Sequence, residues 1–275
     1  MSIRNILVAY SGTDSARAAV RLGRLMMDRY DAHLTGALTY APSEISITLR
    51  PYASEDLTGI IRDAETRRRQ AIHREFFAEL GLEEGERVHW VEARGDVDYS
   101  LTELARSYDI VVMGRYDGTR ENRNLVPHPD LVALHSGRPV LVVPPDLRDN
   151  VLNEKAVLAW DGGRAAARAM SDALDILETR SEVTVISVGE GSAEVLARLD
   201  RVVSHLRCHG IEAEAEIVPR SRRPVARVLL DTVETLGAGL LVMGAYEHSK
   251  FSEDLWGGVT NSVLNEAPVP VLVSH

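Results

Sequence analysis

The sequence contains the same pattern of short apolar segments twice, and this internal repeat limits the possible folds more than any other feature. Three segments of the first half reappear in the second: Asn5–Tyr10 (NILVAY) with Ala156–Trp160 (AVLAW), Ile110–Gly114 (IVVMG) with Leu240–Gly244 (LLVMG), and Pro139–Val143 (PVLVV) with Pro270–Ser274 (PVLVS). Because the three segments recur in the same order in both halves of a chain of 275 residues, the sequence predicts two similar domains produced by tandem duplication.

Short β-branched segments alternate with longer amphipathic ones in each half. In the second half, strands are predicted at Ala156–Trp160, Glu182–Val188, Ala213–Pro219, Gly239–Met243 and Val269–Val273. Helices are predicted at Arg164–Thr179, Ala193–His209, Val225–Leu236 and Leu255–Ala267. This alternation is typical of a parallel sheet with helices on both faces. Each half is therefore predicted to be a five-stranded, doubly wound α/β domain whose ligands bind at the carboxyl ends of the strands.

The two domains are expected to span residues 1–148 and 153–275, with the join near Pro144–Asn153. The first half has about 20 more residues between its second and third strands, and this excess falls around Tyr40–Asp56. That segment follows a strand and contains prolines and scattered apolar residues. We expect it to fold over the ligand-binding end of the first sheet or to contact the second half.

Charge and cysteine content exclude several classes of function. Acidic residues outnumber basic ones by 41 to 31, and the net charge of −10 is the opposite of what a nucleic-acid-binding protein carries. No apolar stretch approaches the roughly 18 residues of a membrane helix, and no signal-peptide core follows the N-terminus. The single cysteine, Cys208, excludes an intramolecular disulfide. The sequence predicts a cytoplasmic protein that binds neither nucleic acid nor membrane.

Catalytic motifs are missing from the sequence, which predicts that the chain is not an enzyme. It has neither a G-x-x-x-x-G-K-[ST] phosphate loop nor a G-x-S-x-G nucleophile elbow. Ser11–Ser15 (SGTDS) is one residue shorter than the S-G-G-x-D-[ST] loop of ATP pyrophosphatases. His205, Cys208 and His209 have a spacing that can hold a metal, although histidines at a helix end more often face solvent. No metal site is predicted.

Two stretches resemble the universal stress protein family in its tandem form: Val242–His275 (VMGAYEHSKFSEDLWGGVTNSVLNEAPVPVLVSH) and Ala156–Met170 (AVLAWDGGRAAARAM). The resemblance covers nearly the whole chain. It implies two Rossmann-like domains of the adenine nucleotide alpha hydrolase-like type and a role in the stress response. Because sheet edges pair between protomers in this family, the last strands of the two halves are expected to pair as an internal pseudo-dimer. A homodimer of the chain is left open.

Family members that bind ATP carry an acidic residue after the first strand and a G-x-x-G-x9-G-[ST] string after the fourth. The glycines let backbone N–H groups approach the phosphates beside the N-terminus of the last helix. The second half matches this pattern in part, with Glu247 at the second glycine position and Gly258 at the final Ser/Thr position. The resemblance therefore implies one ATP, ADP or AMP in the second half, contacted by Ala159, Asp161, Val188, Gly244, His248, Lys250, Gly257, Gly258 and Val259.

The first half departs further from the family pattern, because Ser11 replaces the acidic residue and Asp117 replaces the second glycine. Structural explanations of the second-half residues also stay open. Asp161 can be the N-cap of the next helix, and Gly257 and Gly258 can permit close packing. The sequence is therefore compatible with two functions. One is a stress-response protein that binds an adenine nucleotide, and the other is an interaction scaffold or a carrier of another small ligand.

Overall fold

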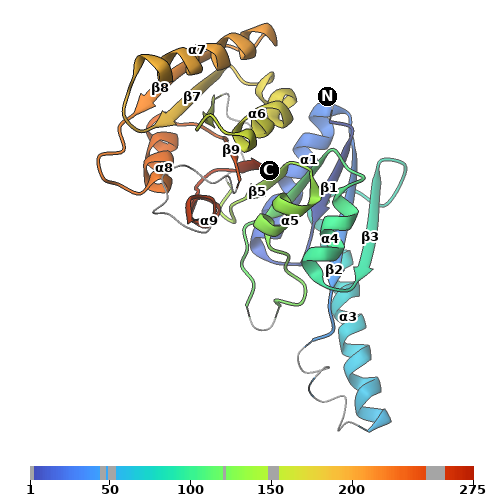
Figure 1. The fold of residues 1–275 in the computed structure, drawn as a ribbon. Helices are drawn as coiled ribbons and strands as arrows, with labels where there is room; N and C mark the ends of the chain where they lie inside the picture. The colour runs from blue at the N-terminus through green and yellow to red at the C-terminus, as the bar shows by residue number, and fades with distance from the viewer. Residues whose placement is uncertain (1–2, 44–47, 49–53, 120–121, 148–154, 246–257) are drawn as a thin grey trace.

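One ten-stranded sheet runs through the whole molecule (Figure 1). The structure, a computed structural model, describes residues 3–43, 48, 54–119, 122–147, 155–245 and 258–275. The strand order is β3-β2-β1-β4-β5-β10-β9-β6-β7-β8. The strands of the first half are β1 (Asn5–Ala9), β2 (His33–Tyr40), β3 (Val88–Arg94), β4 (Ile110–Gly114) and β5 (Val140–Val143). Those of the second half are β6 (Lys155–Ala159), β7 (Glu182–Val188), β8 (Ala213–Val218), β9 (Leu241–Gly244) and β10 (Val271–Ser274).

The prediction of two doubly wound domains, each with a five-stranded parallel sheet, is confirmed. Within each half all strand pairs are parallel, and the strand order of the first half repeats in the second. Apolar residues alternate between the faces, so that Ile6 and Val8 contribute to one core and Leu7 and Ala9 to the other. Strands buried on both faces in this way need helices on each side, and the repeated α/β pattern supplies them.

In the described part of the chain, four helices cover each face of the sheet. One core is closed by α1 (Asp14–Tyr30), α3 (Glu55–Leu80), α6 (Arg164–Leu177) and α7 (Ala193–Cys208). The other is closed by α4 (Val97–Ala105), α5 (Pro129–Ser136), α8 (Val225–Thr235) and α9 (Gly258–Glu266). Three of these helices begin at a polar N-cap residue. The side chains of Thr13, Ser54 and Ser192 accept hydrogen bonds from backbone N–H groups in the first turns of α1, α3 and α7.

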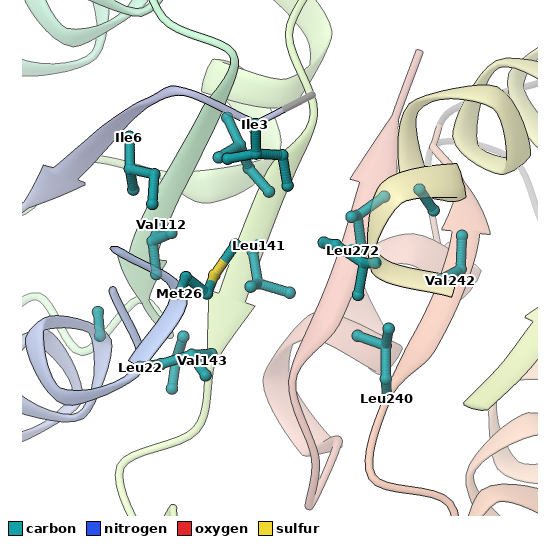
Figure 2. Close-up of a cluster of buried hydrophobic side chains, with 14 of the residues drawn as sticks. Ile3, Ile6, Leu22, Met26, Val112, Leu141, Val143, Leu240, Val242 and Leu272 are labelled. Carbon is teal, nitrogen blue, oxygen red and sulfur yellow. The ribbon is translucent and has the colours of Figure 1, made fainter. Parts of the chain in front are cut away.

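The two halves join where β5 and β10 pair antiparallel, which confirms the predicted internal pseudo-dimer. Leu141 lies opposite Leu272 in this pair. Figure 2 shows these two side chains where the apolar residues of the two halves meet. Each of the two cores contains residues of both halves. The last strands thus cover each other's edges, which removes two exposed apolar edges from the surface.

The extra length of the first half has two structural sources. The prediction located it around Tyr40–Asp56, but α3 also has 26 residues where α7 has 16. In Figure 1 the start of α3 reaches away from the sheet. The beginning of the inserted segment is anchored, because Ala41 N donates to Asn124 O and Asn124 Nδ2 donates to Ala41 O, both at 2.9 Å. Residues 44–47 and 49–53 lie outside the described part of the chain. That the inserted segment folds over the end of the first sheet or contacts the second half therefore stays a prediction.

Candidate functional site

The carboxyl ends of β6, β7 and β9 bring several of the predicted site residues to one edge of the sheet. Ala159 pairs with Ile186, which places Asp161 level with Val188 at the ends of neighbouring strands. Leu158 pairs with Val242, which places Gly244 level with the residue after β6. Ligands of doubly wound sheets bind at such an edge, where the strand order changes direction. The site is therefore assembled by strand register.

Asp161 is exposed and carries the only carboxylate among the predicted site residues. Its Oδ1 accepts a hydrogen bond from Gly163 N at 2.8 Å, and Gly162 between them has φ +85°. The N-cap of α6 is Gly163, without a side-chain cap, so the reading of Asp161 as the N-cap is wrong. Within the described part of the chain Asp161 has no ion-pair partner. Its second oxygen remains available to a ligand.

The two described glycines of the pattern serve different purposes. A Cβ added at Gly244 would lie 2.5 Å from backbone atoms of Ala165 and Ala166 at the start of α6. Gly114 in the first half is equally crowded, with Ser15 C at 2.4 Å. Packing of helix against strand therefore requires glycine at this position in both halves, with or without a ligand. At Gly258, by contrast, an added Cβ meets no described atom within 4 Å, so packing against the described residues does not explain this glycine.

Three apolar members of the predicted site share one side of the sheet. Ala159, Val188 and Val259 are half-buried and pack against the core beneath α8 and α9. Such a surface suits the flat apolar face of an adenine ring. His248, Lys250 and Gly257 lie outside the described residues, as does Glu247. The part of the site that would hold phosphates therefore stays a prediction at those positions.

In the first half the corresponding edge is occupied by the protein's own carboxylates. Asp117, at the second glycine position, accepts a hydrogen bond from Ser15 Oγ at 2.8 Å. Asp98 accepts one from His128 N at 2.6 Å, and its other oxygen lies 2.9 Å from His128 Nδ1. His128 is the N-cap of α5, and its ring stacks on Tyr116 with centroids 4.0 Å apart. Asp98 thus fills the place of an external anion at the start of the last helix of this half.

Sequence reasoning missed the contact between Asp98 and His128. Asp98 is the second residue of α4, and its counterpart, the second residue of α8, is Ala226. Alanine cannot supply a carboxylate, so α8 leaves the N-terminal region of α9 without this internal partner. The sequence contained one signal of this contact, because α4 has aspartate at the position where the equivalent helix α8 has alanine. Nothing local tied Asp98 to a histidine 30 residues away.

Arg115 follows β4 and connects the two halves near this edge. Its Nη2 donates to the carbonyl oxygen of Ala267, which follows α9 in the second half. Burial lowers the pKa of the Arg115 guanidinium from its ordinary value. The Arg115 guanidinium thus points toward the second half. At the first-half edge, Asp98 is hydrogen-bonded to His128, and Arg115 is hydrogen-bonded to a backbone carbonyl group.

The described residues contain no cluster of three or more His, Cys, Asp or Glu side chains that could hold a metal. His205 and His209 instead contact each other edge to face, with ring centroids 4.9 Å apart, and Cys208 is exposed. A helix long and apolar enough to cross a membrane is likewise missing from the described part of the chain.

Two crystal structures resemble this chain over nearly its full length. A universal stress protein from Archaeoglobus fulgidus superposes with a TM-score of 0.75 at 16% identity, covering 98% of this chain and 95% of that one. A putative universal stress protein from Pseudomonas aeruginosa gives 0.59 at 18% identity, covering 99% and 93%. At these identities the likeness shows a shared fold. A search of the curated proteins found no match.

The model of the universal stress protein family matches the sequence twice, at residues 2–144 and 153–275. These two matches coincide with the two halves of the continuous sheet. Together they account for nearly the whole chain. The chain therefore belongs to the universal stress protein family and carries two copies of its domain in tandem.

Proposed function

We propose that the second half binds one adenine nucleotide at the carboxyl edge of β6, β7 and β9, and that the protein acts in the stress response without catalysing a reaction. The contrast between the two edges carries this proposal. In the first half Asp98 already bonds to the N-cap of the last helix, whereas Ala226 occupies its counterpart in the second. The first-half edge carries its own anion at the start of the last helix, whereas α8 supplies none in the second half. The expected compartment is the cytoplasm.

The chemistry of the second edge supports an adenine nucleoside. Ala159, Val188 and Val259 provide an apolar surface, and Asp161 provides an acceptor for a ribose hydroxyl beside it. Gly258 opens α9 with no described neighbour near its Cβ position, so an anion can approach the backbone N–H groups there. An apolar surface with one carboxylate and a helix N-terminus matches the three parts of a nucleotide: base, sugar and phosphate.

The direct test measures bound nucleotide and its dependence on Asp161. Protein purified without added nucleotide is denatured and the released ATP, ADP or AMP is counted per chain, and the emptied protein is titrated calorimetrically with each nucleotide. We expect one site per chain. Asp161→Ala should weaken binding by roughly 1.5–3 kcal/mol, because a charged hydrogen bond to the ribose is lost.

Matched variants separate the two halves. Gly258→Val should reduce affinity by blocking the backbone, and the space around Gly258 predicts that the fold survives. Ser11→Ala at the position equivalent to Asp161 should leave affinity unchanged. Steady ATP hydrolysis that Asp161→Ala abolishes would contradict the non-enzymatic role. An absence of any nucleotide binding at millimolar concentration would instead favour the scaffold or carrier, in which Gly244 serves packing alone.

A further inference from the structure

A second concave site lies on the opposite side of the sheet, between the loop after β6 and the helices α6 and α7. The pocket has a volume of about 270 Å³. Its apolar walls are Trp160, Met170 and Val202, one from each of these elements. Trp160 is only half-buried, and it packs on the core beneath α6 and α7, whereas Ala159 beside it faces the other core. Gly162 also lines the pocket, which therefore lies beside the Asp161 loop, but its apolar walls belong to the opposite core from Ala159, Val188 and Val259.

The polar side of this pocket is basic. Arg198, Arg201 and His205 line it from α7, where the spacing of three and four residues places them on one helix face. Arg198 pairs with Glu194, and this partner lowers the pKa of the Glu194 carboxyl. Among the residues that the structure describes, Arg201 has no ion-pair partner. The pocket keeps an excess of positive charge on a chain whose net charge is −10.

The corresponding place in the first half is filled by side chains. Tyr10, the residue after β1, is 2% exposed and packs edge to face on Phe76 of α3, with centroids 5.6 Å apart. A Cβ added at Gly12 would meet Ile72 at 3.4 Å, whereas at Gly162 the nearest described atom is Arg198 Nη1 at 3.9 Å. The fold itself does not require a hollow here. It arises from the residues that the second half has at these positions.

The geometry points to a binding site for a small aromatic acid, with its ring between Trp160, Met170 and Val202 and its anionic group on Arg198 and Arg201. Trp and Met favour contact with an aromatic ring. Guanidinium groups pair with carboxylate or phosphate oxygens through two parallel hydrogen bonds. Pockets for drug-sized ligands measure roughly 300–1,000 Å³, so this pocket of about 270 Å³ suits a single ring with its acid group.

The test titrates the full chain with four probes of matched size. Benzoate and phenyl phosphate carry ring and anion, cyclohexanecarboxylate lacks the aromatic ring, and benzyl alcohol lacks the charge. Binding is followed by calorimetry, and by the emission of Trp160 in a Trp90→Phe, Trp256→Phe background. We expect benzoate or phenyl phosphate to bind with a dissociation constant of millimolar or below and to change Trp160 emission. The comparison of these two identifies the preferred acid group.

Variants assign the binding to the pocket. Arg201→Gln should weaken the better aromatic acid at least tenfold, and Trp160→Leu should weaken it while removing the preference over cyclohexanecarboxylate. Arg227→Gln is the control, because it removes one exposed positive charge from α8 on the other face. Saturating ATP should leave the affinity for the acid unchanged. The proposal is overturned if neither aromatic acid binds, if Arg201→Gln and Arg227→Gln have equal effects, or if ATP competes for the same site.

Discussion

The residue that follows the first strand has different surroundings in the two halves. Tyr10 in the first half is enclosed by Phe76, and burial raises the pKa of its hydroxyl. Trp160 in the second half borders an open basic pocket. The helices facing these residues differ in the same way: ion pairs Arg17–Glu75 and Arg21–Glu79 connect α1 to α3, whereas α7 directs arginines toward the pocket. Identical topology therefore supports a packed core in one copy and a concave surface in the other.

The carboxyl ends of the strands also differ between the two halves of the sheet. In the first half, Asp98 and Asp117 occupy the edge by accepting hydrogen bonds from His128 N and Ser15 Oγ. In the second half Asp161 is exposed and α8 has alanine where α4 has Asp98. After duplication, the two copies thus differ in which side chains make internal contacts at the same edge of the fold. Substitutions can test this difference from the largest expected effect to the smallest.

The largest contrast is expected between Phe76→Ala and Trp160→Ala. Phe76 is 0% exposed, so its truncation leaves a cavity and should cost about 4 kcal/mol of unfolding free energy. Trp160 already borders open space, so its truncation should cost about half as much. Urea unfolding followed by circular dichroism gives both values. Equal losses would mean that the second-half pocket is packed in solution.

Next in size is the effect of a methyl group at Gly114 or Gly244. Each substitution to alanine forces a Cβ into backbone atoms at about 2.5 Å and should destabilise the protein by about 2–3 kcal/mol. Gly258→Ala is the matched control and should change stability by less than about 0.5 kcal/mol. Thermal unfolding of the three variants measures the difference. A harmless Gly244→Ala would mean that this glycine is retained for a ligand rather than for packing.

A smaller loss is expected for Asp98→Ala. The substitution removes both hydrogen bonds to His128, and because the pair is partly exposed the cost should be about 1–2 kcal/mol. Ala226→Asp is the converse change in the second half, and it should reduce nucleotide affinity by placing an anion near the start of α9. Calorimetric titration with ATP tests this. If the affinity for ATP is unchanged in Ala226→Asp, the interpretation that Asp98 takes the place of an external anion in the first half is contradicted.

The smallest effect is expected for Arg21→Ala, which removes the 2.8 Å ion pair with Glu79 between α1 and α3. Partly exposed pairs of this kind contribute less than about 1 kcal/mol, and salt screens them. The difference from the unmodified protein should therefore shrink when urea unfolding is repeated in 1 M salt. A loss that persists in high salt would show that Arg21 acts through packing of its aliphatic stem instead.

Much of the fold could be predicted because strands and helices leave local patterns of apolar residues in the sequence. The alternation of apolar segments located the strands of the second half to within about two residues, and Glu182–Val188 matches β7 at both ends. The sequence repeat indicated two domains, and the pairing of β5 with β10 followed from the family resemblance. The candidate site was less accessible to prediction. The sequence places Asp161 directly after the first strand of the second half, but its bond to Gly163 depends on the loop geometry around Gly162.

By itself the sequence determined the class of fold, the duplication and the half in which the nucleotide pattern is better kept, because periodicity and motif spacing act over a few residues at a time. Only the tertiary structure decided that Gly244 is required by the backbone of α6, that Asp98 reaches His128, and that α7 leaves a basic pocket beside Trp160. Each of these depends on the distance between elements far apart in the chain. That distance is set by how the side chains of both elements pack together, which no local pattern records.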